Sequence, residues 1–281
     1  MTRLKIIVVF GSKPNFDKDA FKYFILSLNK LQSTYEFSFP DLDEFPFENK
    51  AFPLDNNFCE FSTANSVLES FIANSGQNYD HLIGIITNSF DNHYFFNAKE
   101  NSAIITTDIW DKYFSPPSLF EYLLHSIYCC LLYSQKTLPN RQLSEKAKLL
   151  DIGSHRDTRG CVADFTRNKF DDRIDIVLGY ICDEHKQEII ELFGEEYLKE
   201  TTTILERKWI GNIEEKNSVA YNLKHIFKFD VNKDSGFNKT WLDKIKDKFY
   251  EIPADLTGET LKVILTALLT YFLVKWGLTD K

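Results

Sequence analysis

The amino-acid sequence predicts an α/β (α+β) fold in which helices flank a mixed sheet and a helical extension follows at the C-terminus. In the first 110 residues, short β-branched runs alternate with amphipathic segments, which indicates strands and helices in turn. The 281 residues are 43% hydrophobic and 15% aromatic, which is enough apolar material for one large packed core. The net charge is −8 and no basic stripe is present, so no nucleic-acid partner is expected.

The first half of the chain carries strand and helix signals in alternation. Runs rich in β-branched and aromatic residues predict strands at 4–10, 35–39, 81–87, 93–96 and 102–110. Apolar residues at helical spacing predict one helix at 17–32 and another at 63–76, with Thr63 as N-cap and Gly76 as the stop. Strands connected through helices are typical of a sheet whose faces are covered.

The second half begins with one long predicted helix. Pro116 and Pro117 stand before SLFEYLLHSIYCCLLYS (118–134), so Ser118 is the expected N-cap. Three further segments are expected, a strand at 174–181, helical sequence at 182–212 and a short helix at 240–251. The predicted divisions of the chain are an α/β domain at 1–198, a helical or mixed extension at 199–257 and a hydrophobic C-terminal helix at 258–281.

The compartment expected for this chain is the cytoplasm. The first apolar run ends in a Gly-Ser turn without a small-residue cleavage site, unlike an export signal. The five cysteines are an odd number, and in a reducing compartment they are expected to be free thiols or metal ligands rather than a disulfide framework.

Two histidines and two cysteines follow one another between residues 155 and 185. His155 and Cys161 come first, and Cys182 and His185 follow as a C-x-x-H pair that opens a helix. Thiolate and imidazole donors in a set of four suit tetrahedral zinc with a closed shell. The pattern therefore predicts a structural zinc site. The alternative is that the cysteines are small buried side chains and the histidines are surface groups.

The order of motifs along residues 4–195 resembles the archaemetzincin family of zincin metallopeptidases. The stretches that carry the resemblance are YDHLIGIIT, HYFF, SAIITT, SLFEYLLHSIYCC, RGCVADF and ICDEH. The resemblance implies a zincin-like mixed sheet with an active-site helix at 118–134. It also implies a second, structural zinc beyond that helix, with ligands at His155, Cys161, Cys182 and His185 and with histidine in place of cysteine twice.

The helix that corresponds to the active-site helix lacks the H-E-x-x-H motif, with which a zincin peptidase holds its catalytic zinc and general base. If His125 is the second histidine, Glu121 stands at the first ligand position and Tyr122 at the base position. If His125 is the first histidine, Ser126 and Cys129 take the other two positions. Both registers lose the general base, which predicts a domain without peptidase chemistry.

Glu121, His125 and Cys129 nevertheless form a stripe at helical spacing, opposite an apolar face of the same helix. They are the candidate catalytic residues, because such a stripe is able to chelate a metal or to form a Cys–His nucleophilic pair. The alternative is that Glu121 and His125 form a surface pair while Cys129 packs beneath a loop.

The C-terminal segment contains a continuous uncharged run, VILTALLTYFLV (263–274). A membrane-spanning helix needs about twenty apolar residues, so this run is short for a crossing. We expect a helix within 258–281 that docks onto its own domain or a protein partner, or that associates with a membrane.

The leading prediction is a catalytically degenerate metallopeptidase-like domain that retains a structural zinc and serves as a binding, sensing or interaction module. The alternative is an active hydrolase, either a zinc-dependent peptidase or a thiol enzyme, built on Glu121, His125 and Cys129. The missing general base favours the first.

Overall fold

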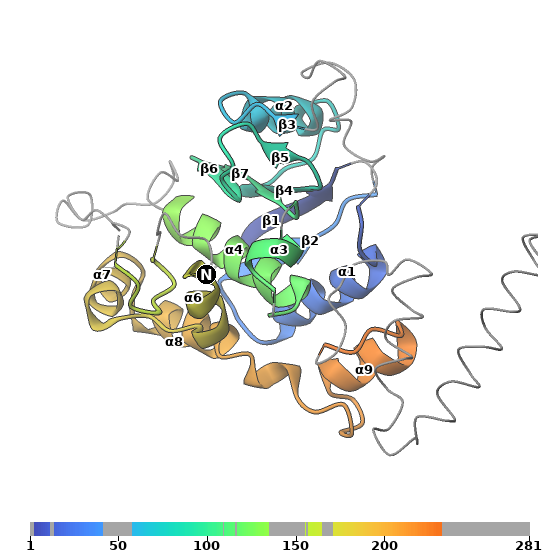
Figure 1. The fold of residues 1–281 in the computed structure, drawn as a ribbon, viewed down its shortest axis with the longest axis vertical. Helices are drawn as coiled ribbons and strands as arrows, with labels where there is room; N and C mark the ends of the chain where they lie inside the picture. The colour runs from blue at the N-terminus through green and yellow to red at the C-terminus, as the bar shows by residue number, and fades with distance from the viewer. Residues whose placement is uncertain are drawn as a thin grey trace, which may run out of the picture. The chain divides into compact units, whose positions relative to one another are not determined.

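The structure, a computed structural model, describes residues 3–11, 14–41, 58–108, 110–115, 117–134, 155, 157–164 and 171–231 (Figure 1). All of these belong to one compact unit, Met1–Phe237, and the second unit is Asn238–Lys281. The helices expected at 240–251 and 258–281 therefore lie outside the described residues.

A five-stranded mixed sheet with the strand order β2-β1-β4-β7-β6 is the framework of the first unit. Its strands are β1 (Leu4–Phe10), β2 (Tyr35–Ser38), β4 (His81–Ile86), β6 (Phe96–Lys99) and β7 (Ser102–Thr106). The strands β2, β1, β4 and β7 run parallel, and β6 pairs antiparallel with β7 at one edge. This sheet and its flanking helices confirm the predicted fold class. A separate parallel pair that the sequence did not indicate consists of β3 (Phe58–Cys59) and β5 (Ser89–Phe90).

Helices cover both faces of the sheet (Figure 1). The three that do so are α1 (Lys18–Ser27), α2 (Ala64–Ala73) and α4 (Leu119–Ser134). Side chains of β1 alternate between two hydrophobic cores, as the two-residue period of a strand requires. Ile6 and Val8 pack in the core that contains α1 and α4, whereas Ile7 and Val9 pack in the core that contains α2. The long helix α4 is therefore buried against the sheet.

The remaining helices follow the sheet in the sequence. They are α3 (Trp110–Tyr113), α6 (Asp172–Leu178), α7 (Asp183–Phe193), α8 (Glu195–Leu205) and α9 (Val219–Ile226). The helical region expected from Cys182 onward is confirmed as α7 and α8, and the boundary predicted at 198 falls inside α8. Within the described ranges, no helix combines the length and the apolarity that a membrane crossing requires.

The strand predicted at 174–181 is wrong, because this segment contains most of helix α6. Asp172 and Asp175 lie one helical turn apart and are both buried, so the acidic side of the helix faces inward. Ile174 is 45% exposed and Val177 is 51% exposed. The β-branched residues that indicated a strand thus lie partly at the surface, and tertiary packing overrides their propensity.

Of the strand predicted at 93–96, only Phe96 lies in a strand. His93 has φ 61°, a left-handed conformation that an extended strand does not contain. The chain becomes regular at Phe96 and continues as β6 to Lys99. The strand predicted at 102–110 ends at Thr106, since helix α3 follows it.

One buried imidazole in the sheet leads to a pH-dependent prediction. His81 begins β4 with 0% exposure, and neither ring nitrogen has a hydrogen-bond partner among the described residues. Burial lowers the pKa of His81 from 6.5 to about 4, against a smaller opposing effect of Asp80. The unfolded chain therefore binds the proton first as pH falls. Stability is retained above pH 6.5 and is lost between pH 6.5 and 4, by about 3 kcal/mol.

The change that tests this is His81→Leu, which keeps the volume and removes the proton-binding site. We expect its free energy of unfolding in urea to decrease about 3 kcal/mol less between pH 7 and pH 4 than that of the wild type. Equal losses in the two proteins would show that other groups cause the acid sensitivity.

Candidate metal centre

Backbone contacts bring the two halves of the segment 155–185 together. The N–H of His155 donates to the carbonyl of Ala163 at 3.0 Å. The N–H of Val162 donates to the carbonyl of Tyr180 at 2.7 Å, next to the bridge between Cys161 and Tyr180. The second half is thereby held beside the turn that contains Cys161, and it returns there through helix α6 instead of the strand predicted at 174–181.

The C-x-x-H pair occupies the start of helix α7. Cys182 is the N-cap residue in an extended conformation, and His185 is the third residue of the helix. Side chains at the N-cap and three residues later meet at the same end of a helix, as they do in a capping box. The spacing of Cys182 and His185 therefore directs both donor atoms to one point.

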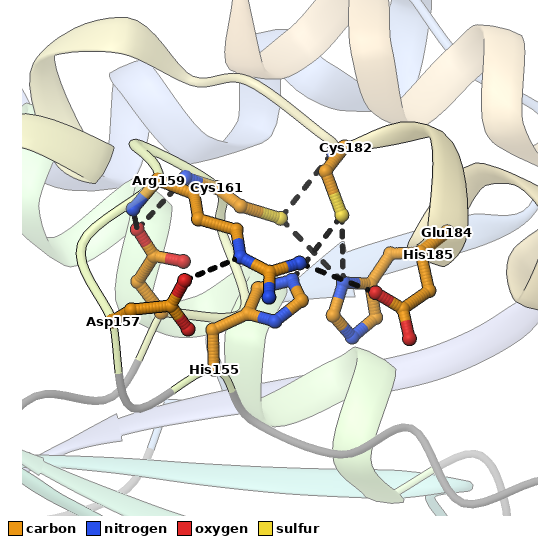
Figure 2. Close-up of polar contacts among 8 residues, drawn as sticks. His155, Asp157, Arg159, Cys161, Cys182, Glu184 and His185 are labelled. Carbon is orange, nitrogen blue, oxygen red and sulfur yellow. Dashed lines mark hydrogen bonds and ion pairs between the residues drawn. The ribbon is translucent and has the colours of Figure 1, made fainter.

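The four predicted ligands converge (Figure 2). Their donor atoms all lie within 4.8 Å of one another. Cys182 Sγ lies 3.2 Å from His155 Nε2 and 3.2 Å from His185 Nδ1. Cys161 Sγ lies 3.6 Å from His185 Nδ1. Zinc bonds of about 2.3 Å to sulfur and about 2.0 Å to nitrogen with tetrahedral angles give separations of about 3.3–3.8 Å, and these contacts lie within a few tenths of an ångström of those values.

All four ligands are buried, with exposed fractions of 8% for His155, 0% for Cys161, 8% for Cys182 and 3% for His185. The alternative that the histidines are surface groups is therefore wrong. The two imidazole rings meet edge to face, with centroids 4.5 Å apart and an interplanar angle of 76°. The donor set is thus enclosed by protein.

Neighbouring groups orient the donor atoms. The backbone N–H of Cys182 donates to Cys161 Sγ at 3.3 Å, a contact that favours a thiolate. Asp164 fixes the turn, since its Oδ2 accepts from the N–H of Cys161 at 3.1 Å. Glu188 Oε2 lies 3.8 Å from His185 Nε2, the ring nitrogen that does not face the sulfurs. A carboxylate behind a histidine is a common orienting group for a metal ligand.

The Cys161 thiol and the His155 imidazole are both neutral when no metal ion is bound. Burial raises the pKa of Cys161 to about 12, although the N–H groups of Ala163 and Cys182 act against it. Burial and the nearby His185 and Arg159 lower the pKa of His155, which favours the neutral imidazole that binds metals. Without a cation the cysteine thiol is protonated, so binding of a cation displaces that proton.

A layer of charged side chains lies over the cluster at the surface (Figure 2). Arg159 Nε lies 2.9 Å from Asp157 Oδ2, and its guanidinium reaches Glu184 Oε2 at 3.3 Å. The arginine is therefore held by two carboxylates of its own chain.

Glu121 has a structural partner that the sequence stripe did not indicate. Its Oε2 accepts from the N–H of Ser118 at 2.8 Å, and Ser118 Oγ accepts from the N–H of Glu121 at 3.3 Å. This is a reciprocal capping box, which confirms Ser118 as the N-cap of α4. Arg207 also pairs with Glu121 at 3.2 Å. The carboxylate is thus engaged at the end of the helix.

His125 and Cys129 lie inside the protein rather than on its surface. His125 Nε2 is 3.3 Å from Asp175 Oδ2, and both residues are buried. Cys129 interacts with His125 and donates its thiol to the carbonyl of Val162 at 3.3 Å. The expected packing of Cys129 beneath a loop is therefore present, whereas the surface pair of Glu121 and His125 is not. Asp175 is the partner that sequence reasoning missed, and two aspartates at helical spacing were the available signal.

A second group of metal ligands on α4 is not supported. Among the residues that the structure describes, His155, Cys161, Cys182 and His185 are the one group of three or more donors close enough to hold an ion. Glu121, His125 and Cys129 do not form such a group there.

The fold and this cluster define an α/β domain with a candidate Cys2His2 metal centre. No protein-family model and no curated protein matches the chain. The chain is similar to the crystal structure of archaemetzincin from Methanopyrus kandleri, at 13% sequence identity and a TM-score of 0.42. The similarity covers 73% of this chain and 95% of that chain. The solved protein belongs to the family that the motif order resembles, and the similarity concerns the fold alone.

Proposed function

We propose that the domain binds one zinc ion through His155, Cys161, Cys182 and His185, and that this ion is structural. The observation that carries the proposal is the buried convergence of two thiols and two imidazoles, whose closest separations of 3.2–3.6 Å suit tetrahedral zinc. A bound zinc ion supplies four strong bonds between segments that are distant in sequence, and a filled shell has no position for a reacting water.

The second part of the proposal is that the domain has no peptidase activity. Glu121, the one carboxylate in the sequence stripe on α4, is occupied by the capping box and by Arg207. His125 is occupied by Asp175 inside the core. A general base has to reach the reacting water and its substrate. His125 is buried, and the carboxylate of Glu121, although its side chain is 25% exposed, is held by the start of α4 and by Arg207.

A thiol hydrolase is the competing function, because Cys129, His125 and Asp175 follow the order nucleophile, base and orienting carboxylate. Two observations disfavour it. Burial raises the pKa of Cys129 despite the opposing effect of His125, so the thiolate is disfavoured. The thiol also donates to the carbonyl of Val162, and only 5% of Cys129 is exposed.

The module is further proposed to work in the cytoplasm by binding a partner rather than by catalysis. The uncharged run at 263–274 supports a protein partner or a membrane as the binding surface, since it contains no charged residue and is mostly apolar. This segment lies outside the described residues, so the proposal rests on its sequence.

The experiment that tests the proposed function is metal analysis of the purified chain beside a peptide-cleavage assay. We expect one zinc per chain, about zero in a variant with Cys161→Ser and Cys182→Ser, and one in Cys129→Ser. A diverse peptide library should remain intact. Cleavage that His125→Ala abolishes would contradict the loss of activity, and a wild-type chain without zinc would contradict the metal site.

A further inference from the structure

We infer that the buried group of His125, Cys129 and Asp175 is a positioning element for the metal centre, through which helix α4 holds both chain segments that carry the cysteine ligands. The inference rests on the proposed zinc site and deepens it. It assigns a role to three buried polar residues that neither the zinc shell nor a catalytic mechanism uses.

The first contact reaches the turn that contains Cys161. Cys129, in the third turn of α4, donates its thiol to the carbonyl of Val162 at 3.3 Å. Val162 directly follows the ligand Cys161 and is itself buried. The Val162 carbonyl lies in the peptide bond to Ala163, one residue beyond Cys161, so this hydrogen bond restrains the path of the turn that carries the Cys161 side chain.

The second contact reaches the segment that leads to Cys182. His125 Nε2 lies 3.3 Å from Asp175 Oδ2 in helix α6. The carbonyl of Asp175 accepts from the N–H of Gly179 at 2.8 Å, where the helix ends in a left-handed residue. Cys182 follows three residues later. The ion pair therefore fixes the end of α6 from which the chain enters the metal site.

The two segments also contact each other, which closes the network. The Val162 N–H donates to the carbonyl of Tyr180 at 2.7 Å. Cys129 and His125 stand four residues apart on one side of α4, so a single helical turn carries both contacts. Moving that turn would displace the segment of His155 and Cys161 relative to the segment of Cys182 and His185.

The contact between His125 and Asp175 pairs two buried groups, and Cys129 is the further polar neighbour of His125. His125 Nδ1 and Asp175 Oδ1 are buried without a hydrogen bond within the described part of the chain. If either residue is changed, the other loses its oppositely charged partner inside the protein and has to shift or draw in water. The ligands then lose preorganisation, which appears as weaker metal binding even when the fold persists.

The test is zinc affinity, measured by competition with a chromophoric chelator in samples whose far-UV circular dichroism matches the wild type. We expect Asp175→Asn and Cys129→Ala to weaken zinc binding roughly 10- to 100-fold. Cys129→Ser retains a donor toward Val162 and should bind within about threefold of the wild type. The absorption bands of the Co²⁺-loaded Asp175→Asn and Cys129→Ala proteins should also shift.

Leu68→Ala is the matched control, because Leu68 is equally buried but belongs to the core on the opposite face of the sheet. It should lower the stability of the fold and leave zinc affinity and the Co²⁺ spectrum unchanged. The inference is overturned if Asp175→Asn and Cys129→Ala behave like Leu68→Ala while the wild type binds zinc tightly. If the wild type binds no zinc, the proposed function fails and the inference with it, so the two failures are distinguishable.

Discussion

Replacing Cys182 with serine is expected to cause the largest loss of stability of any single ligand change in this chain. Cys182 Sγ contacts donor atoms of both histidines, and the residues that the structure describes contain no other group of donors that could hold the ion in its place. Structural zinc contributes on the order of 10 kcal/mol to the folding of small zinc domains, and that energy belongs to the folded state alone. This domain also has a hydrophobic core, so the zinc site supplies only part of its stability. We therefore expect Cys182→Ser to lower the free energy of unfolding by about 4 kcal/mol or more.

The measurement is urea unfolding of the wild type and the variant, each with and without a zinc chelator. The chelator should lower the stability of the wild type to about that of Cys182→Ser and should have no further effect on the variant. Cys59→Ser is the matched control, since Cys59 is also a buried thiol but packs in the core on the α2 side. It should lose only about 1–3 kcal/mol and should remain sensitive to the chelator. A chelator effect that persists in Cys182→Ser would contradict the assignment of this ligand.

The sequence could predict the metal ligands because their geometry is mostly local. Cys182 and His185 are brought together by one turn of helix, and their donor chemistry is readable from residue type alone. The parallel strands were also readable, since β1 and β4 are buried on both faces and appear as continuous apolar runs. These signals lie within short windows, which is why they survive in a single sequence.

The partner of His125 could not be predicted, because it depends on a contact between residues 50 positions apart in sequence. The helix α6 was also hidden, since its apolar β-branched residues outnumber the two buried aspartates that decide its orientation. Glu121 follows Ser118 at the spacing of a capping box, but it also precedes His125 at the spacing of a metal-binding stripe, and the stripe was the interpretation chosen. Long-range contacts and competing local roles account for these errors.

Replacing Gly179 with alanine is expected to have the second largest effect. Gly179 ends helix α6 with φ 56°, a conformation that costs a non-glycine residue about 1 kcal/mol or somewhat more. A Cβ atom added there would lie 2.2 Å from the backbone oxygen of Leu205 in α8. Because backbone atoms cannot rotate away as a side chain can, α6 and α8 would have to separate, and we expect a total loss of about 3–5 kcal/mol.

Gly76→Ala separates the strain of the left-handed backbone from the clash with α8. Gly76 has φ 68°, and a Cβ atom there meets nothing within 4 Å. In chemical denaturation it should lose only the strain energy, about 1 kcal/mol. Gly179 stands three residues before Cys182, so its variant should also release zinc to a chelator faster than Gly76→Ala does. If both glycine variants lost the same stability, the approach of α8 to the end of α6 would not be the constraint, and the path of the chain into the metal site would need another explanation.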